Sequence, residues 1–189
     1  MKHLFLAATA AAVLAFAAQN MKAADPDTSA GAAYCEQTGG KVIDREPVFG
    51  TNGPPSSWLV LTGPRQFCQY TSPKDGSRIH VLVQTLYATT PTLAALAYYA
   101  KVAPGEGGGG NPASYYCTQL GGSDSFGGVN AAGGGWVGKG SKDAVLEACI
   151  FPDMSSIDSW GLFYNSASIV RGIDLTTVLR YAPPPAAAH

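Results

Sequence analysis

Charged side chains and histidines are both scarce in this sequence, and each shortage excludes a class of function. Only 13% of its 189 residues are charged, the formal net charge is −1, and no stretch concentrates lysine and arginine. Proteins that bind nucleic acid or anionic lipid normally gather positive charge in one patch, so neither partner is expected. His80 is the one histidine away from the two ends of the chain, which leaves a single candidate for histidine-assisted catalysis.

The common catalytic and metal-binding motifs are also missing. The sequence has no G-x-S-x-G, no H-E-x-x-H, no C-x-x-C and no calcium-loop pattern. Gly133–Lys139 matches the first part of a phosphate-binding loop, but Gly140 stands where a serine or threonine would hold magnesium. We interpret that segment as a surface hairpin, and we expect no catalytic residue, no cofactor and no metal ion.

Three titratable residues could still carry chemistry. His80 lies between Ile79 and Val81, and this alternation is typical of a strand with His80 on its exposed face. Asp153 and Asp158 could in principle act as an acid–base pair on a glycan. We favour the simpler interpretation, in which both are turn or surface acids.

Residues 1–24 have the pattern of a secretory signal peptide. Lys2 is followed by an apolar run, Leu4–Ala18, and then by small residues suited to cleavage. An uncleaved anchor is the alternative, but many residues of the run are alanine and it ends at Gln19 and Asn20. We expect a periplasmic or secreted protein that makes no stable membrane insertion once the signal is removed.

A short helix with its own start and stop is predicted at Asn111–Gly122. Asn111 can cap the first N–H groups, Pro112 suits the first helical position, and Gly121 suits a left-handed exit. A weaker copy runs from Ser29 to Gly40, and the two share the core Tyr-Cys-x-Gln-x-Gly-Gly. This repetition indicates an internal duplication.

The four cysteines follow the same repetition. Cys35 and Cys68 are 33 residues apart, and Cys117 and Cys149 are 32 apart. An even number of cysteines in an exported chain is normally read as disulfides, although sequence alone leaves three connectivities open. The repeat favours Cys35–Cys68 and Cys117–Cys149, each closing a loop of about 34 residues and contributing roughly 3–4 kcal/mol of stability.

The order of the remaining segments predicts an α+β fold built from two tandem, disulfide-stapled units. The first unit is 25–102, a Gly-rich linker covers 103–110, and the second unit is 111–181, followed by a disordered Pro/Ala tail at 182–189. Each unit is expected to contain a helix, an antiparallel sheet of about three strands and a closing helix. The expected strands are 41–48, 58–62, 65–70, 78–87, one from 136, 144–151 and 157–164, and the expected closing helices are 91–100 and 173–181.

The second unit resembles a family of short bacterial exported domains of unknown function that are often labelled haemolysins. The resemblance lies in Asn111-Pro-Ala-Ser-x-Tyr-Cys117, Gly121-Gly122, Cys149-Ile-Phe-Pro-Asp153 and Ile157-Asp-Ser-Trp160. The first unit matches weakly, through Tyr34-Cys35, Gly39-Gly40, Cys68-Gln-Tyr70 and Asp75-Gly76. Met154 and Ser159 depart from the pattern, which usually has a glycine and an acidic residue there. The resemblance implies a bacterial protein that acts outside the cytoplasm.

Aromatic residues and long loops are the remaining places where a ligand could bind. Trp58, Trp136 and Trp160, together with Tyr34 and Tyr116, could form a sugar-stacking or partner-binding face. Their matched places in the repeat favour core and sheet packing instead. The loops 50–57 and 123–135 are long, Gly-rich and different in the two units, so they are the favoured binding loops.

Together these features predict a non-enzymatic exported module that binds or inhibits a protein or an envelope component. A membrane-active, haemolysin-like protein is one alternative, suggested by the family label. A hydrolase of an envelope polymer, using scattered acids, is the other.

Overall fold

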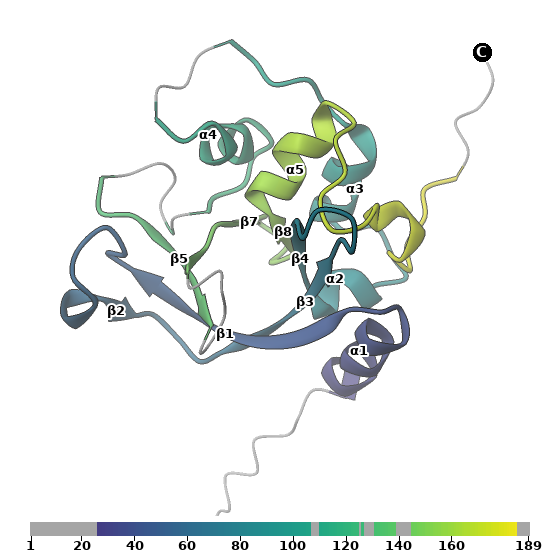
Figure 1. Cartoon of the computed structure of the whole chain (residues 1–189), viewed down its shortest axis with the longest axis horizontal. Helices are drawn as coiled ribbons and strands as arrows, with labels where there is room; N and C mark the ends of the chain where they lie inside the picture. The colour runs from purple at the N-terminus through teal and green to yellow at the C-terminus, as the bar shows by residue number, and fades with distance from the viewer. Residues whose placement is uncertain (1–25, 107–109, 125, 127–130, 139–144, 185–189) are drawn as a thin grey trace, which may run out of the picture.

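The computed structural model describes residues 26–106, 110–124, 126, 131–138 and 145–184. Within those ranges the chain folds into five α-helices and eight β-strands (Figure 1). The α-helices are α1 (Pro26–Gln37), α2 (Val83–Tyr87), α3 (Leu93–Ala100), α4 (Pro112–Gln119) and α5 (Ser159–Ser166). The strands are β1 (Lys41–Phe49), β2 (Leu59–Val60), β3 (Arg65–Thr71), β4 (Arg78–Leu82), β5 (Gly134–Gly138), β6 (Val145–Leu146), β7 (Ala148–Ile150) and β8 (Ser156–Asp158).

All eight strands belong to one antiparallel sheet. Its order is β6-β5-β1-β3-β4-β8-β7, with β2 also paired to β1. Only Glu147 separates β6 from β7, yet these strands stand at opposite ends of that order. The sheet must therefore curl until its two ends meet at Glu147, and Figure 1 shows the strands following one another around such a curl.

The repeat predicts a small sheet in each unit and leaves open whether the two sheets pair edge to edge or pack back to back; in the structure their strands form a single sheet. Strand β1 of the first half pairs with β5 of the second along Arg45–Phe49. Strand β4 pairs with β8, with Val81 opposite Ile157. Pairing between the halves gives backbone partners to strands that would otherwise be open edges, so the halves share one sheet.

The two predicted disulfides, Cys35–Cys68 and Cys117–Cys149, are confirmed. Each fastens a helix to a strand, α1 to β3 and α4 to β7. Cys68 lies opposite Val81, and Cys149 lies opposite Ile157. The two disulfides thus stand at the ends of one row of residues that crosses β3, β4, β8 and β7.

The geometry around the two disulfides is nearly the same. Gly39 and Gly121 leave their helices with φ of 85° and 84°. The next N–H, from Gly40 or Gly122, donates to the carbonyl of the helix cysteine at 2.8 or 2.9 Å. In the first half, Lys41 follows Gly40 and pairs with Gln69, the residue after Cys68. In the second half, Ser123 follows Gly122 and pairs with Ile150, the residue after Cys149.

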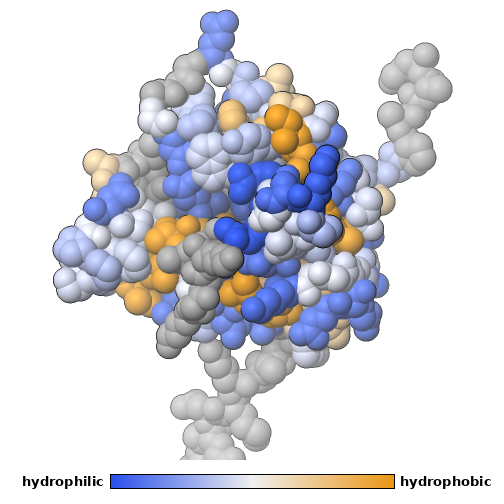
Figure 2. Space-filling view, in the orientation of Figure 1, coloured by the Kyte–Doolittle hydropathy of each residue, from blue (hydrophilic) through white to orange (hydrophobic). Residues whose placement is uncertain are grey.

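Two clusters of buried apolar residues lie on opposite faces of the sheet. The larger packs the helices against the outer face and includes Tyr70, Ile79, Val81, Ile157 and Leu162. The smaller fills the inside of the curl with residues from five strands, namely Phe67, Leu82, Trp136, Leu146 and Ala148. Both faces of the sheet are therefore buried. Hydrophobic residues on the view in Figure 2 form separate areas among hydrophilic ones.

Several predicted elements differ from the structure. The predicted strand 157–164 is β8 only as far as Asp158 and then becomes α5, and the predicted strand 78–87 becomes α2 at Val83. The predicted closing helix 173–181 contains only a short 3₁₀ turn, Leu175–Thr177, and the predicted strand 58–62 is reduced to β2. The predicted signal peptide and most of the predicted disordered tail lie outside the described residues.

Part of the predicted linker is hydrogen bonded to α4. The Tyr116 hydroxyl donates to the carbonyl of Val102 at 2.5 Å. The Gln119 amide donates to Ala103 at 3.0 Å and accepts from the N–H of Gly105 at 2.7 Å. Residues 102–105 are therefore held against the helix by its side chains.

Substituting the second glycine of each Gly-Gly pair should destabilise the protein more than substituting the first. A Cβ on Gly40 would lie 2.3 Å from Sγ of Cys68, and one on Gly122 would lie 2.4 Å from Sγ of Cys149. Gly39 and Gly121 have open space around the same position. We expect Gly40→Ala and Gly122→Ala to cost about 3 kcal/mol, as overpacking does, against about 1–2 kcal/mol for the left-handed positions.

Urea denaturation of the four single variants measures these differences. Equal losses at both glycines of a pair would show that the contact with the disulfide has no energetic importance.

Candidate functional site

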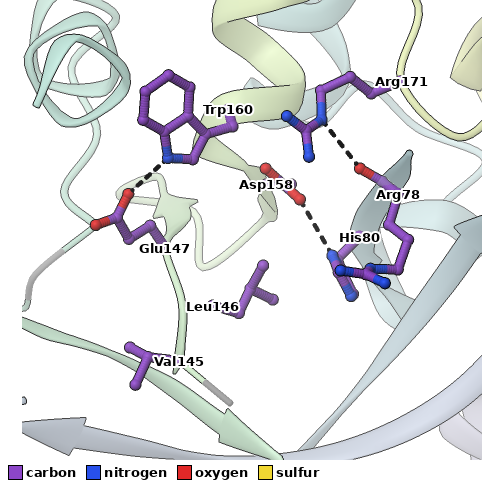
Figure 3. Close-up of a pocket in the computed structure, with 8 residues that line it drawn as sticks. All are labelled: Arg78, His80, Val145, Leu146, Glu147, Asp158, Trp160 and Arg171. Carbon is purple, nitrogen blue, oxygen red and sulfur yellow. Dashed lines mark hydrogen bonds and ion pairs between the residues drawn. The ribbon is translucent and has the colours of Figure 1, made fainter. Parts of the chain in front are cut away.

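A cavity of about 260 Å³ lies beside the meeting point of the two sheet ends (Figure 3). Its walls come from β4, β6, the end of β8, the start of α5 and the segment after α5. The lining residues are Arg78, His80, Val145, Leu146, Glu147, Asp158, Trp160 and Arg171. The polar side chains of this set come from both halves of the chain.

His80 is buried inside the curl, with 1% of its surface exposed. Its Nδ1 lies 3.1 Å from Oδ2 of Asp158, and its Nε2 lies 3.0 Å from Oε1 of Gln69 and 3.3 Å from Nη2 of Arg45. The prediction of an exposed histidine is therefore wrong. Alternation along β4 does place His80 and Val81 on opposite faces, but both faces of this sheet are buried.

Asp158 is also buried rather than a surface acid, with 5% of its surface exposed. One carboxylate oxygen contacts His80, and the other accepts from the N–H of Gly161 at 2.9 Å. The second contact caps α5, which explains why the chain turns from strand to helix directly after Asp158.

Asp153 lies outside the cavity, on an exposed turn before β8. Its carboxylate accepts from the N–H of Leu93 at 2.7 Å and from the hydroxyl and N–H of Ser155 at 2.6 and 3.0 Å. The structure therefore does not bring Asp153 and Asp158 together as a pair in one site.

Arg45 is a buried cation that the sequence analysis missed. It is 0% exposed, and its guanidinium donates to the carbonyl of Trp136 at 3.1 Å and contacts His80. The one signal in the sequence is a charged residue in the middle of a predicted strand. A charged residue in that position is ordinary on a strand with one solvent-exposed face, so its burial is revealed only by the pairing of β1 within the sheet.

Glu147 connects the cavity wall to two helices. Its Oε2 accepts from the Asn111 amide at 2.6 Å and from the Trp160 indole N–H at 2.9 Å. Asn111 in turn caps α4 through the N–H groups of Ala113 and Ser114. The predicted helix cap is thus confirmed, and it also anchors the acid that orients Trp160.

The aromatic residues fall into two groups. Trp136 and Tyr116 are buried, as core packing predicts. Trp160 is only partly buried and lies on α5 beside the cavity rather than in the sheet. Trp58 and Tyr34 are partly buried and do not line the cavity, and the indole N–H of Trp58 donates to the carbonyl of Gly53.

Arg171 projects into the cavity from the segment that follows α5. Its Nε donates to the carbonyl of Arg78 at 3.3 Å, and its guanidinium lies 5.3 Å from the Tyr164 ring centre. Tyr164 in turn lies 5.9 Å from the Trp160 ring, one helical turn away. Figure 3 shows the two terminal nitrogens directed toward Trp160 and Asp158. In the part of the chain that the structure describes, no hydrogen bond or ion pair engages these two nitrogens.

The two predicted binding loops contact each other rather than the cavity. The N–H groups of Gly50 and Asn52 donate to the carbonyls of Gly133 and Ala132, both at 3.0 Å. The Asn52 amide donates to Ala131 at 3.1 Å. Residues 125 and 127–130 of the second loop lie outside the described residues. None of the residues that line the cavity belongs to either loop.

Two other kinds of site are not found in the described ranges. No helix there has both the length and the apolar character needed to cross a bilayer. No group of three or more histidine, cysteine and acidic residues there is arranged to hold a metal ion.

Comparison with known proteins gives no match: no family model, no curated protein and no solved structure matches the chain. The resemblance to exported bacterial domains labelled haemolysins therefore stays a prediction. The function has to be argued from the geometry of the cavity.

The His80–Asp158 contact should matter for stability. Removing one partner of a buried, hydrogen-bonded pair typically costs about 3–5 kcal/mol, so Asp158→Ala should lose about that much because it removes the partner and the helix cap together. Asp158→Asn keeps an efficient cap and should lose markedly less. Urea denaturation of both variants measures the difference. Similar losses would contradict a separate role for the cap.

Asp153 should make stability depend on pH in the acid range. Burial alone would raise the pKa of Asp153, but hydrogen bonds from Ser155 and from the N–H of Leu93 lower it below its ordinary value of 3.8. A carboxyl whose pKa is lower in the folded state stabilises the protein above its unfolded pKa. That contribution disappears as the pH falls through the folded pKa.

Asp153→Asn should therefore be less stable than the parent at pH 6, and the gap should close toward pH 2. Unfolding free energies measured by urea at several pH values check this. Asp44→Asn, on an exposed part of β1, is the matched control. A gap that stays constant with pH would contradict the assignment.

Proposed function

We propose that the protein is an exported, non-enzymatic module that holds part of a protein or envelope component in the cavity lined by Trp160 and Arg171. One observation carries this proposal. The acidic and basic groups suited to proton transfer are engaged by the protein itself, whereas the terminal nitrogens of Arg171 face the cavity.

His80 has the wrong surroundings for a general base. A catalytic histidine needs one ring nitrogen within reach of the substrate. Both ring nitrogens of His80 have partners inside the curl, and only 1% of the residue is exposed. A structural role, holding Asp158 and Arg45 in place, accounts for these contacts.

The two acids of the cavity also make hydrogen bonds within the protein. Both oxygens of Asp158 have partners in His80 and the N–H of Gly161. One oxygen of Glu147 accepts two hydrogen bonds, from Asn111 and Trp160. These contacts make a fixed wall that can position a ligand, which favours binding over acid–base chemistry.

Two disulfides and the signal-peptide pattern support action outside the cytoplasm, in the periplasm or after secretion. The repeated disulfide geometry supports descent of the two halves from one duplicated unit. A small fold stapled in this way presents its cavity with little loss of conformational freedom on binding, as an inhibitor or adaptor requires.

Retention of the mature protein by envelope material tests the proposal. We expect the protein to sediment with an envelope fraction, such as peptidoglycan sacculi or envelope membranes, without releasing soluble products. Arg171→Gln should weaken retention by about tenfold or more, because it removes the guanidinium whose terminal nitrogens face the cavity.

Arg180→Gln is the matched control. Arg180 also lies over an aromatic ring, 4.0 Å from the centre of Tyr87, but it does not line the cavity. Its variant should bind like the parent. Release of products that stops in the Asp158→Asn variant would overturn the non-enzymatic assignment, and so would a failure of every fraction to retain the protein.

A further inference from the structure

We infer that the cavity receives a single carboxylate group, such as the free end of a peptide, and that Arg171 binds it. This inference rests on the proposed binding function and names the chemistry of its ligand.

The guanidinium of Arg171 makes two contacts with the protein. Its Nε is tied to the carbonyl of Arg78, and the Tyr164 ring lies against it. Tyr164 is itself packed against Trp160 on the same helix. Both terminal nitrogens lie on the cavity side of the guanidinium, one toward Trp160 and the other toward Asp158 (Figure 3). Such a fork matches the two oxygens of a carboxylate.

The charges around the cavity disfavour an anion of double charge. Among the described lining residues, Arg78 and Arg171 are balanced by Glu147 and Asp158. Asp158 lies close to the direction in which Arg171 points (Figure 3). A group of double charge, such as a phosphate dianion, would be repelled by both carboxylates. A single carboxylate gains the fork of Arg171 with half of that repulsion.

The size of the cavity favours the end of a chain over a folded segment. The cavity, at about 260 Å³, is smaller than the roughly 300–1,000 Å³ of pockets for drug-sized ligands. Val145 and Leu146 supply apolar surface on the side of the cavity away from Arg171, and Trp160 lies nearer to it (Figure 3). A small apolar residue that ends in a carboxylate would contact both kinds of wall.

A pair of peptides that differ only at the carboxyl end tests the inference. The probes are N-acetyl-Ala-Ala as the free acid, the same peptide as the C-terminal amide, and inorganic phosphate at matched ionic strength. Binding is followed by the NMR signals of the Trp160 indole N–H and the Arg171 Nε–H. We expect the free acid to bind in about the millimolar range, and the amide and phosphate to bind at least about tenfold more weakly.

Three variants show whether affinity for the free acid depends on the paired donors of the Arg171 guanidinium or only on its positive charge. Arg171→Gln should lose about tenfold or more of the affinity for the free acid. Arg171→Lys keeps the charge but not the fork, and it should recover only part of the affinity. Arg180→Gln should bind like the parent. Thermal unfolding and circular dichroism show whether each variant is folded, and Arg171→Lys provides the test if Arg171→Gln is not.

Three results would overturn the inference: equal binding of amide and acid, phosphate binding as tight as that of the acid, or no change at Trp160 with any probe. If one of these occurs while envelope retention still depends on Arg171, the binding function stands and only the ligand class is wrong. If retention is lost as well, both proposals fail.

Discussion

The contact on which the rest of the structure depends is the antiparallel pairing of β4 with β8. Val81 and Ile157 face each other there, and both are fully buried. Because neighbouring residues on paired strands point to the opposite face, the same register puts His80 opposite Asp158 inside the curl. A single backbone pairing thus joins the two halves on the outer face and assembles the polar network on the inner one. Neither half could form the cavity alone, because each supplies only part of its wall.

Features that depend on local chemistry could be predicted from the sequence. The cap at Asn111, the left-handed exit at Gly121 and the pairing of the cysteines all follow from residue types at short spacings or from the repeat. The geometry of each feature is set within one helix and the strand bonded to it, so it does not depend on how the sheet is assembled. The sequence therefore indicated the α+β class and the two disulfides correctly.

The candidate site depends on long-range pairing, and this is why most of it could not be predicted. His80 was interpreted as exposed because a strand normally has one solvent-exposed face, and nothing local shows that both faces of this sheet are buried. Trp160 was expected in a strand because the sequence does not show where β8 ends. Asp158 can cap a helix only when the strand ends at that residue. Glu147 and Arg171 belong to no motif, and they become neighbours of His80 only through pairing between the halves.

The one-residue junction at Glu147 has a consequence for how the sequence can vary. Leu146 and Ala148 both point into the curl, from strands that pair with different partners. Side chains on a strand alternate between its two faces. An insertion or deletion of one residue between Leu146 and Ala148 would therefore move the inward-facing side chains of one strand to its outer face. Length changes should therefore be tolerated far less at this junction than in the segment between β1 and β3. The spacing from Leu146 to Ala148 is a signature by which distant relatives of the chain could be recognised.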